Sequence, residues 1–304
     1  MEMIGVFLIG FGQVSSLDEL GAFLKHVTGR EPSQEMIRGA RARYERIGGS
    51  SPLLKITRKQ AKKLKVLLEI SGISANIYIG MRHSPPTIHE AVVEAKKHQI
   101  KQAVVITLAP QYSEMSVGAY LKLFDQALED NGNPFPVKKV RSYGAHPIFI
   151  EAVAANLKDA MEREPAMNPA STPVIFSAHS LPAKIIEKGD PYLDELKQGM
   201  TGVSERLKIG NARLAFQSRG GGPGEWLGPS IEEVIEDFKR EGKAQVVVSP
   251  LGFVSDHVET LYDIDVAAKL KAKELGLEFR RAASLNDSPG FIKLLAALVK
   301  ENIA

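Results

Sequence analysis

The chain has 304 residues, of which 44% are hydrophobic and 25% charged, the composition of an ordinary globular protein. Disordered, collagen-like and fibrous classes are therefore excluded. The 39 Lys and Arg residues against 36 Asp and Glu residues give a net charge of +3. The two signs are interleaved along the chain, so we expect no nucleic-acid partner.

The chain contains no cysteine, which excludes disulfides, thiolate-ligated zinc, cysteine-ligated iron–sulfur clusters and thiol nucleophiles. Its uncharged stretches, residues 3–17 and 165–183, are interrupted by Gly or Pro and are too short or too broken to span a membrane. No basic residue precedes the N-terminal apolar run. We therefore expect no signal peptide, no integral membrane segment and a cytoplasmic location.

Short Val- and Ile-rich runs alternate with segments of helical period, which is typical of parallel sheets with crossover helices. The predicted strands, in chain order, are Ile4–Ile9, Asn76–Gly80, Ala103–Leu108, Val137–Arg141, Val174–Ser177, Arg213–Phe216, Gln245–Ser249 and Leu277–Arg281. The predicted helices between them are Ser33–Ile47, Arg58–Glu69, Thr87–His98, Ser116–Asp130, Pro147–Arg163, Ser230–Arg240, Asp256–Leu275 and Pro289–Glu301.

Four strands in each half predict an α/β fold of two similar lobes, residues 1–145 and 146–304, each a four-stranded parallel sheet flanked by helices. The last helix is assigned to the second lobe by its place in the sequence. The alternative is that it packs back on the first lobe. An internal repeat supports the two lobes. Pro86–Val92 resembles Pro229–Ile235, and both place Thr or Ser three residues before Glu, which predicts a capping box at the start of each helix. Ligands of such folds bind at the strand ends, so we expect a cleft there.

Two glycine-rich segments do not predict nucleotide binding. Gly10–Ser15 follows a strand, but Ser15 stands where a dinucleotide fingerprint needs its third glycine. Arg219–Trp226 lacks the Gly-Lys-Ser/Thr ending of a phosphate-binding loop. The first segment predicts a tight turn approached by a bulky group. The second is either a plain flexible loop or the border of a flat ligand.

Candidate chemistry centres on a histidine and a line of acids. His179 directly follows a predicted strand, at the sheet edge where open α/β sheets place functional side chains. Asp256, Glu259 and Asp263 are spaced i, i+3, i+7, which predicts one helix face, with no lysine or arginine before Lys269. The helix dipole explains Asp256 but not Asp263. An imidazole with carboxylates suits a labile divalent metal such as Fe(II), Mn(II) or Co(II) better than structural zinc.

Anionic groups of a substrate have candidate partners in the first half. Three arginines, Arg41, Arg43 and Arg46, surround Tyr44 on a predicted helix. Such a cluster is usually a solvated face. The turn that follows, residues 48–53, offers hydroxyls and open N–H groups for carboxylates and favours a binding role.

These motifs together resemble those of the ferrochelatases, in the right order and across nearly the whole chain. The matching segments are Tyr44–Leu53, Ala178–Pro182, Gly189–Tyr192, Glu225–Pro229 and Gly252–Asp263. The resemblance implies two flavodoxin-like lobes of the chelatase fold and insertion of Fe(II) into a porphyrin with loss of two pyrrole protons, a late step of haem biosynthesis. It implies that Fe(II) is a substrate and that no cofactor is required.

The resemblance also implies roles for particular residues. His179 and Glu259 would be catalytic and, with Asp263, would bind the metal. The implied porphyrin contacts are Phe11, Arg43, Tyr44, Ser51, Arg82, His83, Tyr120 and Trp226. Porphyrin and ferrous iron are the implied partners, with the next haem-pathway enzyme and an iron donor as further candidates.

Three positions depart from the family pattern. Phe11 stands where short bacterial coproporphyrin-type members carry a tyrosine that can ligate product iron, and Val27-Thr28 replaces a pair of arginines. Ala267 replaces an acid that many members have one turn beyond Asp263. We expect coproporphyrin III as substrate in modest preference to protoporphyrin IX. The alternatives are a chelatase for cobalt or nickel and a tetrapyrrole such as sirohydrochlorin, and a porphyrin or haem carrier without turnover.

Overall fold

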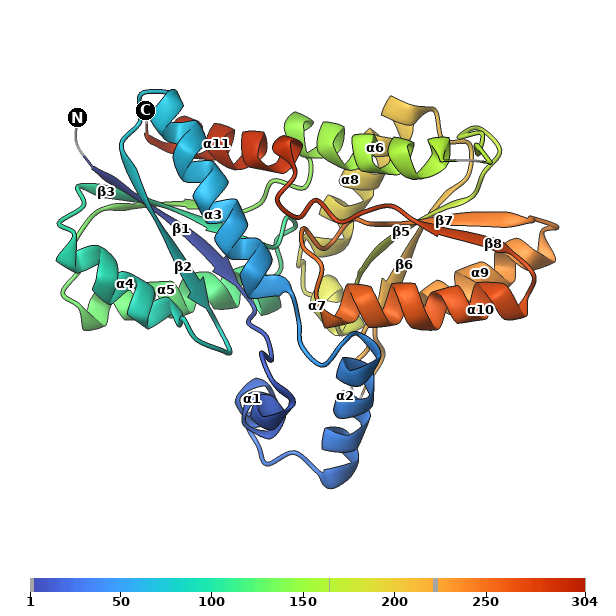
Figure 1. The fold of residues 1–304 in the computed structure, drawn as a ribbon, viewed down its shortest axis with the longest axis horizontal. Coiled ribbons are helices and arrows are strands. Elements are labelled where there is room, and N and C mark those ends of the chain that lie inside the picture. The colour runs from blue at the N-terminus through green and yellow to red at the C-terminus, as the bar shows by residue number, and fades with distance from the viewer. Residues whose placement is uncertain (1–2, 164, 221–223, 304) are drawn as a thin grey trace. The chain divides into compact units, whose positions relative to one another are not determined.

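The structure is a computed structural model that describes residues 3–163, 165–220 and 224–303 (Figure 1). It consists of two compact units. Unit 1 comprises the described residues of Met1–Ala109, Glu114–Ser142 and Asn286–Ala304, and unit 2 those of Pro110–Ser113 and Tyr143–Leu285.

The sheet of unit 1 is parallel and has the strand order β2-β1-β3-β4. Its strands are β1 (Ile4–Gly10), β2 (Ala75–Met81), β3 (Gln102–Thr107) and β4 (Val137–Val140). Helices α4 (Ile88–Lys97) and α5 (Ala119–Asp130) cover one face, and α3 (Leu53–Ile70) and α11 (Pro289–Ile303) cover the other (Figure 1). Every residue of β1 is buried because both faces are covered, which explains its unbroken apolar run.

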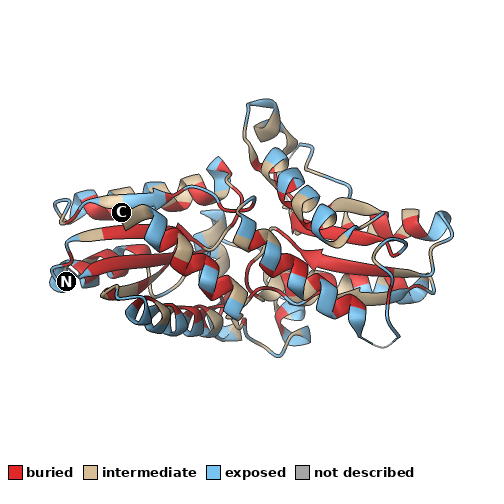
Figure 2. Ribbon diagram, turned by 90° about the horizontal axis from the view of Figure 1, so that it is seen from above, coloured by how far each residue is buried: buried red, intermediate tan, exposed pale blue. Residues whose placement is uncertain are grey.

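Unit 2 repeats this plan with the strand order β6-β5-β7-β8. Its strands are β5 (Val174–His179), β6 (Ala212–Gln217), β7 (Gln245–Pro250) and β8 (Glu278–Arg281). One face carries α9 (Ile231–Arg240), the π-helix η3 (Glu259–Ala268) and α10 (Lys269–Glu274), and the other carries α6 (Pro147–Glu162) and α8 (Tyr192–Leu207). In Figure 2 the strands of both sheets are largely buried, whereas the helices alternate between buried and exposed sides.

The internal repeat is confirmed at the level of hydrogen bonds. Thr87 and Glu90 form a capping box at the start of α4, and Ser230 and Glu233 form one at the start of α9. In each unit a π-helix follows the third strand, η2 (Glu114–Gly118) in unit 1 and η3 in unit 2. The eight predicted strands are all present, each within two residues of its predicted bounds.

Several predicted boundaries were wrong. Helices α1 (Leu20–Thr28), α7 (Ala183–Glu187) and α8 were missed. Helix α2 (Gln34–Arg46) lies where it was predicted, whereas α3 begins at Leu53 rather than Arg58. The central segment of unit 1 ends at Ser142, close to the predicted residue 145, and the segment from Asn286 onward belongs to unit 1, in agreement with the alternative that the last helix packs back on the first lobe. The reason is packing: the buried face of α11 lies against α3, β3 and β4.

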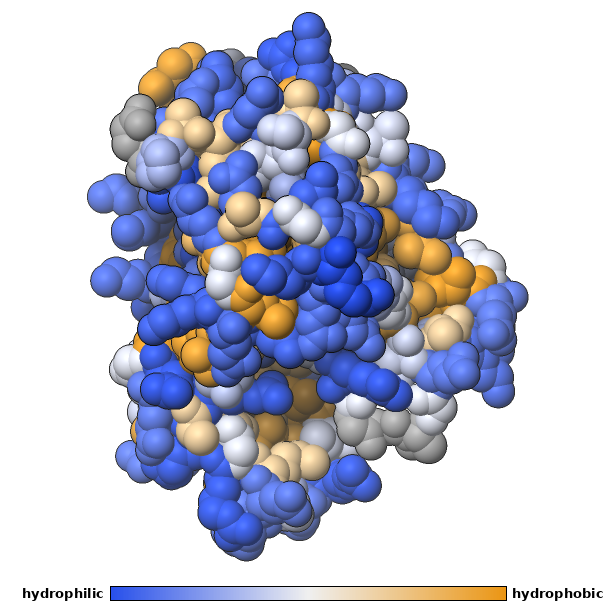
Figure 3. Space-filling view, turned by 90° about the vertical axis from the view of Figure 1, so that its right-hand side faces the viewer, coloured by the Kyte–Doolittle hydropathy of each residue, from blue (hydrophilic) through white to orange (hydrophobic). Residues whose placement is uncertain are grey.

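Within the described residues, no helix is long and apolar enough to cross a membrane. The face of the molecule in Figure 3 is covered mainly by hydrophilic side chains, and the hydrophobic ones gather in separate patches.

Candidate active site

His179 and Glu259 meet at the carboxyl end of the sheet in unit 2. His179 is the last residue of β5, and Glu259 is the first residue of the π-helix that follows β7. Strand β5 lies between β6 and β7, so these two residues come from the point where the strand order reverses. The Nε2 atom of His179 is 3.5 Å from Oε1 of Glu259.

The pair shares a strong electrostatic interaction. Burial by itself lowers the pKa of His179, but the Glu259 carboxylate and the Ser180 carbonyl overcome this effect and raise the pKa to about 9. Burial raises the pKa of Glu259, but the charge and hydrogen bonds of His179 and His257 hold it well below its usual range. At neutral pH the pair is therefore an imidazolium facing a carboxylate. The side chains are 35% and 27% exposed, so protons can exchange with solvent.

A second imidazole reaches the same carboxylate. Nε2 of His257 is 3.4 Å from Oε2 of Glu259. Each histidine has its Nδ1 directed at a backbone carbonyl, His179 at Ser180 O (2.6 Å) and His257 at Ser255 O (3.1 Å). A carbonyl at Nδ1 makes that nitrogen the donor, so Nε2 of each ring is the atom that can accept a proton or bind a cation.

The end of β6 holds the π-helix in place. Gln217, which is paired in register with His179, donates from Nε2 to the backbone carbonyl of Glu259 (2.8 Å). Ser218 donates to Oδ2 of Asp263 (2.5 Å), and the negative charge of Asp263 contributes to the raised pKa of His179. The sequence analysis missed Gln217 and Ser218. Their position at a strand end next to His179 is the signal that could have found them.

Asp256 does not belong to the predicted acidic face. The π-helix begins at Glu259, so Asp256 precedes it. Its carboxylate accepts from Arg281 (2.8 Å) and Ser284 (2.7 Å), and Arg281 also pairs with Asp265 (3.0 Å). The prediction that Asp256 shares a helix face with Glu259 and Asp263 was wrong, and its charge is offset by Arg281, which lies 25 residues further along the chain.

Phe11 and His83 lie together at the strand ends of unit 1. Phe11 follows β1, His83 follows β2, and their ring centroids are 4.6 Å apart. Nδ1 of His83 is 2.8 Å from Nδ1 of His26, on the helix α1 that the sequence analysis missed. Burial, Arg82 and His26 lower the pKa of His83 to about 4, so His83 is neutral at physiological pH. Phe11 is 40% exposed.

The other predicted contacts of unit 1 differ in accessibility. The guanidinium of Arg82 lies 5.9 Å from the ring centroid of Tyr120 and donates to the carbonyl of Met115 (3.3 Å). Arg43 is exposed, whereas Tyr44, Ser51 and Tyr120 are buried. The structure therefore places Phe11, Arg43 and Arg82 where a ligand can reach them, and shows the buried three as packed against the protein.

The predicted turn at Gly12 is explained by packing within unit 1. Gly12 has φ +113°, and a Cβ there would lie 3.0 Å from the backbone nitrogen of Ser84. Ser84 also accepts a hydrogen bond from the backbone N–H of Gln13 (3.1 Å). The bulky group that approaches this turn is therefore the chain itself.

A family model for ferrochelatase matches residues 3–303. The chain is 38% identical over 304 residues to the ferrochelatase of Deinococcus radiodurans, with 99% of this chain and 96% of the relative covered. This chain belongs to the ferrochelatase family. Its members insert a metal ion into a porphyrin, and the ferrochelatase therefore acts on porphyrin and ferrous iron.

Another relative of this ferrochelatase is named as a coproporphyrin III ferrochelatase. It comes from Halalkalibacterium halodurans and is 35% identical, with 100% of this chain and 98% of the relative covered. Among solved structures, SirB from Bacillus subtilis with Fe3+ has a TM-score of 0.62 at 11% identity, covering 100% of this chain and 96% of that one. This likeness confirms the two-lobe chelatase fold.

Trp226 of the ferrochelatase supports the loop after His179. Its backbone forms an antiparallel bridge with Pro182, and Leu227 donates to the carbonyl of Leu181 (2.8 Å). A Cβ at Gly220 would lie 2.3 Å from the Trp226 ring, so this ring packs directly on the glycine. Gly221–Pro223 of the same predicted loop lie outside the described residues. The ring packs on Gly220 on one side and remains partly exposed.

In the part of the ferrochelatase chain that the structure describes, no three or more His, Asp or Glu side chains form a group that could hold a metal ion. His179 and Glu259 approach each other, and Asp263 accepts a hydrogen bond from Ser218.

Proposed function

We propose that His179 and Glu259 receive Fe(II) and remove the two pyrrole protons of the porphyrin. The observation that supports this proposal is the 3.5 Å approach of Nε2 of His179 to Oε1 of Glu259 at the carboxyl end of β5. A neutral imidazole and a carboxylate are suitable ligands for Fe(II), and both are proton acceptors.

The reaction exchanges two protons for one dication. Fe(II) sheds water, the two pyrrole N–H bonds break, four nitrogen–iron bonds form and two protons leave. With a pKa of about 9, His179 carries a proton at neutral pH, and it must release that proton before it can accept another or bind iron. The exposed part of the pair allows this proton to pass to solvent. His257, within 3.4 Å of Glu259, provides a second imidazole for the proton transfer.

Unit 1 supplies the porphyrin contacts in this proposal. Arg43 and Arg82 carry permanent positive charge suited to propionate carboxylates. Phe11 offers an exposed ring to the macrocycle but no atom that could ligate iron. His83 is a further porphyrin contact beside Phe11. We also assign porphyrin contacts to Tyr44, Ser51 and Tyr120, which are buried in the structure, and to the partly exposed Trp226 of unit 2.

The proposed substrate is coproporphyrin III, in a late step of haem synthesis. The support is the similarity to the coproporphyrin III ferrochelatase of Halalkalibacterium halodurans, while Phe11 and Val27-Thr28 depart from the pattern of that branch. We further propose a cytoplasmic enzyme. It would need no cofactor, and a chain without cysteine cannot hold a cysteine-ligated iron–sulfur cluster. Its product would pass to the next haem-pathway enzyme, and its iron would come from a donor.

An anaerobic insertion assay tests these proposals. Fe(II) is supplied with coproporphyrin III or protoporphyrin IX, and metalation is followed by absorbance. A higher kcat/KM for coproporphyrin III is expected, and a higher value for protoporphyrin IX would contradict the substrate assignment. Full turnover by His179→Ala would contradict the assignment of His179, whichever porphyrin is used.

Parallel reactions with Co(II) and Ni(II), and with sirohydrochlorin, extend the assay to the other chelatase activity. We expect Fe(II) and coproporphyrin III to give the highest kcat/KM. Stoichiometric porphyrin binding without any metalation would support a carrier instead.

A further inference from the structure

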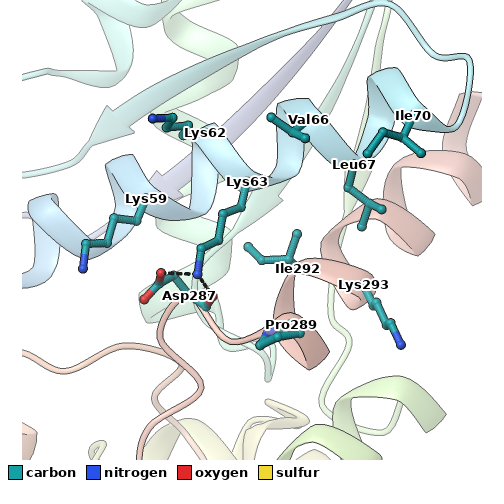
Figure 4. Close-up of a pocket in the computed structure, with 10 residues that line it drawn as sticks. All are labelled: Lys59, Lys62, Lys63, Val66, Leu67, Ile70, Asp287, Pro289, Ile292 and Lys293. Atoms are coloured by element: carbon teal, nitrogen blue, oxygen red, sulfur yellow. Dashed lines mark hydrogen bonds and ion pairs between the residues drawn. The ribbon is translucent and has the colours of Figure 1, made fainter.

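A groove of about 720 Å³ lies between α3 and α11 in unit 1, away from every residue assigned above (Figure 4). Its apolar lining consists of Val66, Leu67, Ile70, Pro289 and Ile292. Pockets of this size, mainly apolar with a few charged groups, are typical of sites for small ligands.

The α3 side of the groove changes from basic to apolar along the helix. Lys59 and Lys63 lie on the same face as Val66 and Ile70, since the spacing i, i+4, i+7, i+11 follows the helical repeat. From Lys59 to Ile70 the helix rises about 16 Å. In Figure 4 Lys59, Lys62 and Lys63 lie toward one end of the groove, and Val66, Leu67 and Ile70 lie toward the other, where Lys293 of α11 also lies.

Positive charge is in excess at the basic end. Lys59, Lys62 and Lys63 line this end together with a single carboxylate, that of Asp287. Lys63 is engaged by Asp287, through Oδ2 (2.5 Å) and the backbone carbonyl (2.7 Å). Because one carboxylate offsets only one of the three ammonium groups, this end can attract an anion.

Two hydrophobic side chains at the apolar end are strongly exposed. Ile70 is 78% exposed and Val66 is 48% exposed. No other large hydrophobic side chain in the described part of the chain is as exposed as Ile70. Grouped exposed apolar side chains beside charged ones are typical of binding surfaces.

We propose that this groove binds an anion that carries an aliphatic chain. The anionic head contacts Lys59, Lys62 and Lys63, and the chain lies along Val66, Leu67, Ile70 and Ile292. The four lysines and one carboxylate of the lining give the groove a net positive charge next to its apolar side chains, which supports this class of ligand. The proposal does not depend on the metal-insertion site, because none of these residues takes part in it.

Calorimetric titration of the full chain with dodecyl phosphate, below its micelle concentration, tests the proposal. Saturable binding at one site is expected, together with methyl NMR shifts at Val66, Leu67 and Ile70. Uncharged dodecyl maltoside should bind at least tenfold more weakly. Equal binding of the two amphiphiles, or no shift at these methyl groups, would overturn the proposal.

Matched variants test the two ends separately. Lys59→Glu with Lys62→Glu should weaken dodecyl phosphate binding at least tenfold, whereas Lys65→Glu, exposed on α3 but outside the groove, should not. Ile70→Ser should weaken binding, whereas Leu270→Ser, exposed on α10, should not. Equal losses in variant and control would overturn the proposal. Insertion activity should be unchanged in all four proteins and reports that they are folded.

Vesicles distinguish the source of the anion. Vesicles of phosphatidylcholine, with and without phosphatidylglycerol, are sedimented with the protein. A membrane lipid would be identified if the protein sediments with anionic vesicles in a salt-sensitive way and the Lys59→Glu, Lys62→Glu double variant does not. Binding of dodecyl phosphate without sedimentation would identify a free amphiphile, and both results support the proposed chemistry.

Discussion

The two units share one strand order but differ in the chemistry at their strand ends. In unit 2, His179 faces Glu259, and its pKa is raised to about 9. In unit 1, His83 lies beside Arg82 and His26, and its pKa is lowered to about 4. At neutral pH, of two histidines at comparable strand ends, His179 is therefore positively charged and His83 is neutral. The topology provides the location, and the neighbouring charges decide the chemistry.

Removal of His179 should have the largest effect on activity, because it removes the charged imidazole that distinguishes unit 2 from unit 1. We expect His179→Ala to lower kcat about 100- to 10,000-fold, the range for a positioned general base, with porphyrin affinity largely retained. Steady-state metalation and porphyrin fluorescence titration measure the two quantities. The matched change in unit 1, His83→Ala, should raise KM for the porphyrin more than it lowers kcat. Equal kcat losses in both variants would contradict the division of roles.

Glu259→Gln tests the cause of the raised pKa while keeping the side-chain shape. Without the carboxylate, burial dominates, and the pKa of His179 should fall from about 9 to below its ordinary value of 6.5. NMR titration of the imidazole measures this shift, and kcat should fall with it. An unchanged pKa would mean that Glu259 is not the source of the shift.

Metal binding should compete with the His179 proton. Because the imidazole must be deprotonated to bind a cation, Co(II) affinity should fall about tenfold for each pH unit below 9, with about one proton released per ion at neutral pH. Calorimetry in buffers of different ionisation enthalpy measures the release. A pH-independent affinity between pH 6 and 8 would contradict it.

The two histidines should also affect folding stability with opposite signs. The folded pKa of His179 lies above 6.5, so its ion pair stabilises the fold below pH 6.5 and this contribution is lost as the pH rises through 9. The folded pKa of His83 lies below 6.5, so its contribution is present above pH 6.5 and lost as the pH falls through 4. Urea unfolding of His179→Ala and His83→Ala across pH 4 to 10 checks both signs.

Phe11→Tyr would give unit 1 a phenol oxygen that can ligate iron. If the Phe11 ring lies at the iron, a phenolate should ligate the product and slow haem release by roughly tenfold, equivalent to about 1.4 kcal/mol. Stopped-flow transfer of haem to an acceptor protein and the visible spectrum report the change. An unaltered spectrum and off-rate would show that this ring does not lie at the iron.

The smallest effects are expected where the units are alike. Thr87→Ala and Ser230→Ala each remove a capping-box hydroxyl and should lower the free energy of unfolding by about 1 kcal/mol. Insertion activity should be unchanged in both. Urea denaturation measures the free energy of unfolding of each variant. A clear difference between the two losses would show that the two capping boxes do not contribute equally to stability.

The strands could be predicted because buried parallel strands are short, apolar runs bounded by turns. The missed helix α8 has a weaker signal, since Gly199 and Gly202 lower its helix propensity and small residues are required there. A Cβ at Gly199 would lie 2.9 Å from the backbone oxygen of Gly144, and one at Gly202 would lie 2.5 Å from Ile150. These contacts depend on tertiary packing and leave no periodic pattern.

The candidate site could be predicted only in part. His179 and Glu259 were predicted from their position and from family resemblance, and the structure brings them together. The pairing of Asp256 with Arg281 is long-range, and the register of a π-helix differs from the 3.6-residue repeat, so the predicted acidic face was wrong. His257 lies within the Gly252–Asp263 motif, but its contact with Glu259 depends on the backbone conformation before the π-helix and could not be predicted from the sequence.

The position of α11 has a consequence for synthesis on the ribosome. Residues 286–303 complete unit 1, whose four strands all come from the first 142 residues of the chain. The buried side of α11, which includes Phe291 and Leu295, covers β3 and β4 only after the whole of unit 2 has been translated. A nascent chain thus contains every residue of unit 2 before unit 1 can close. The unit that emerges first is the last to be finished, and its apolar sheet face depends on shielding during that interval.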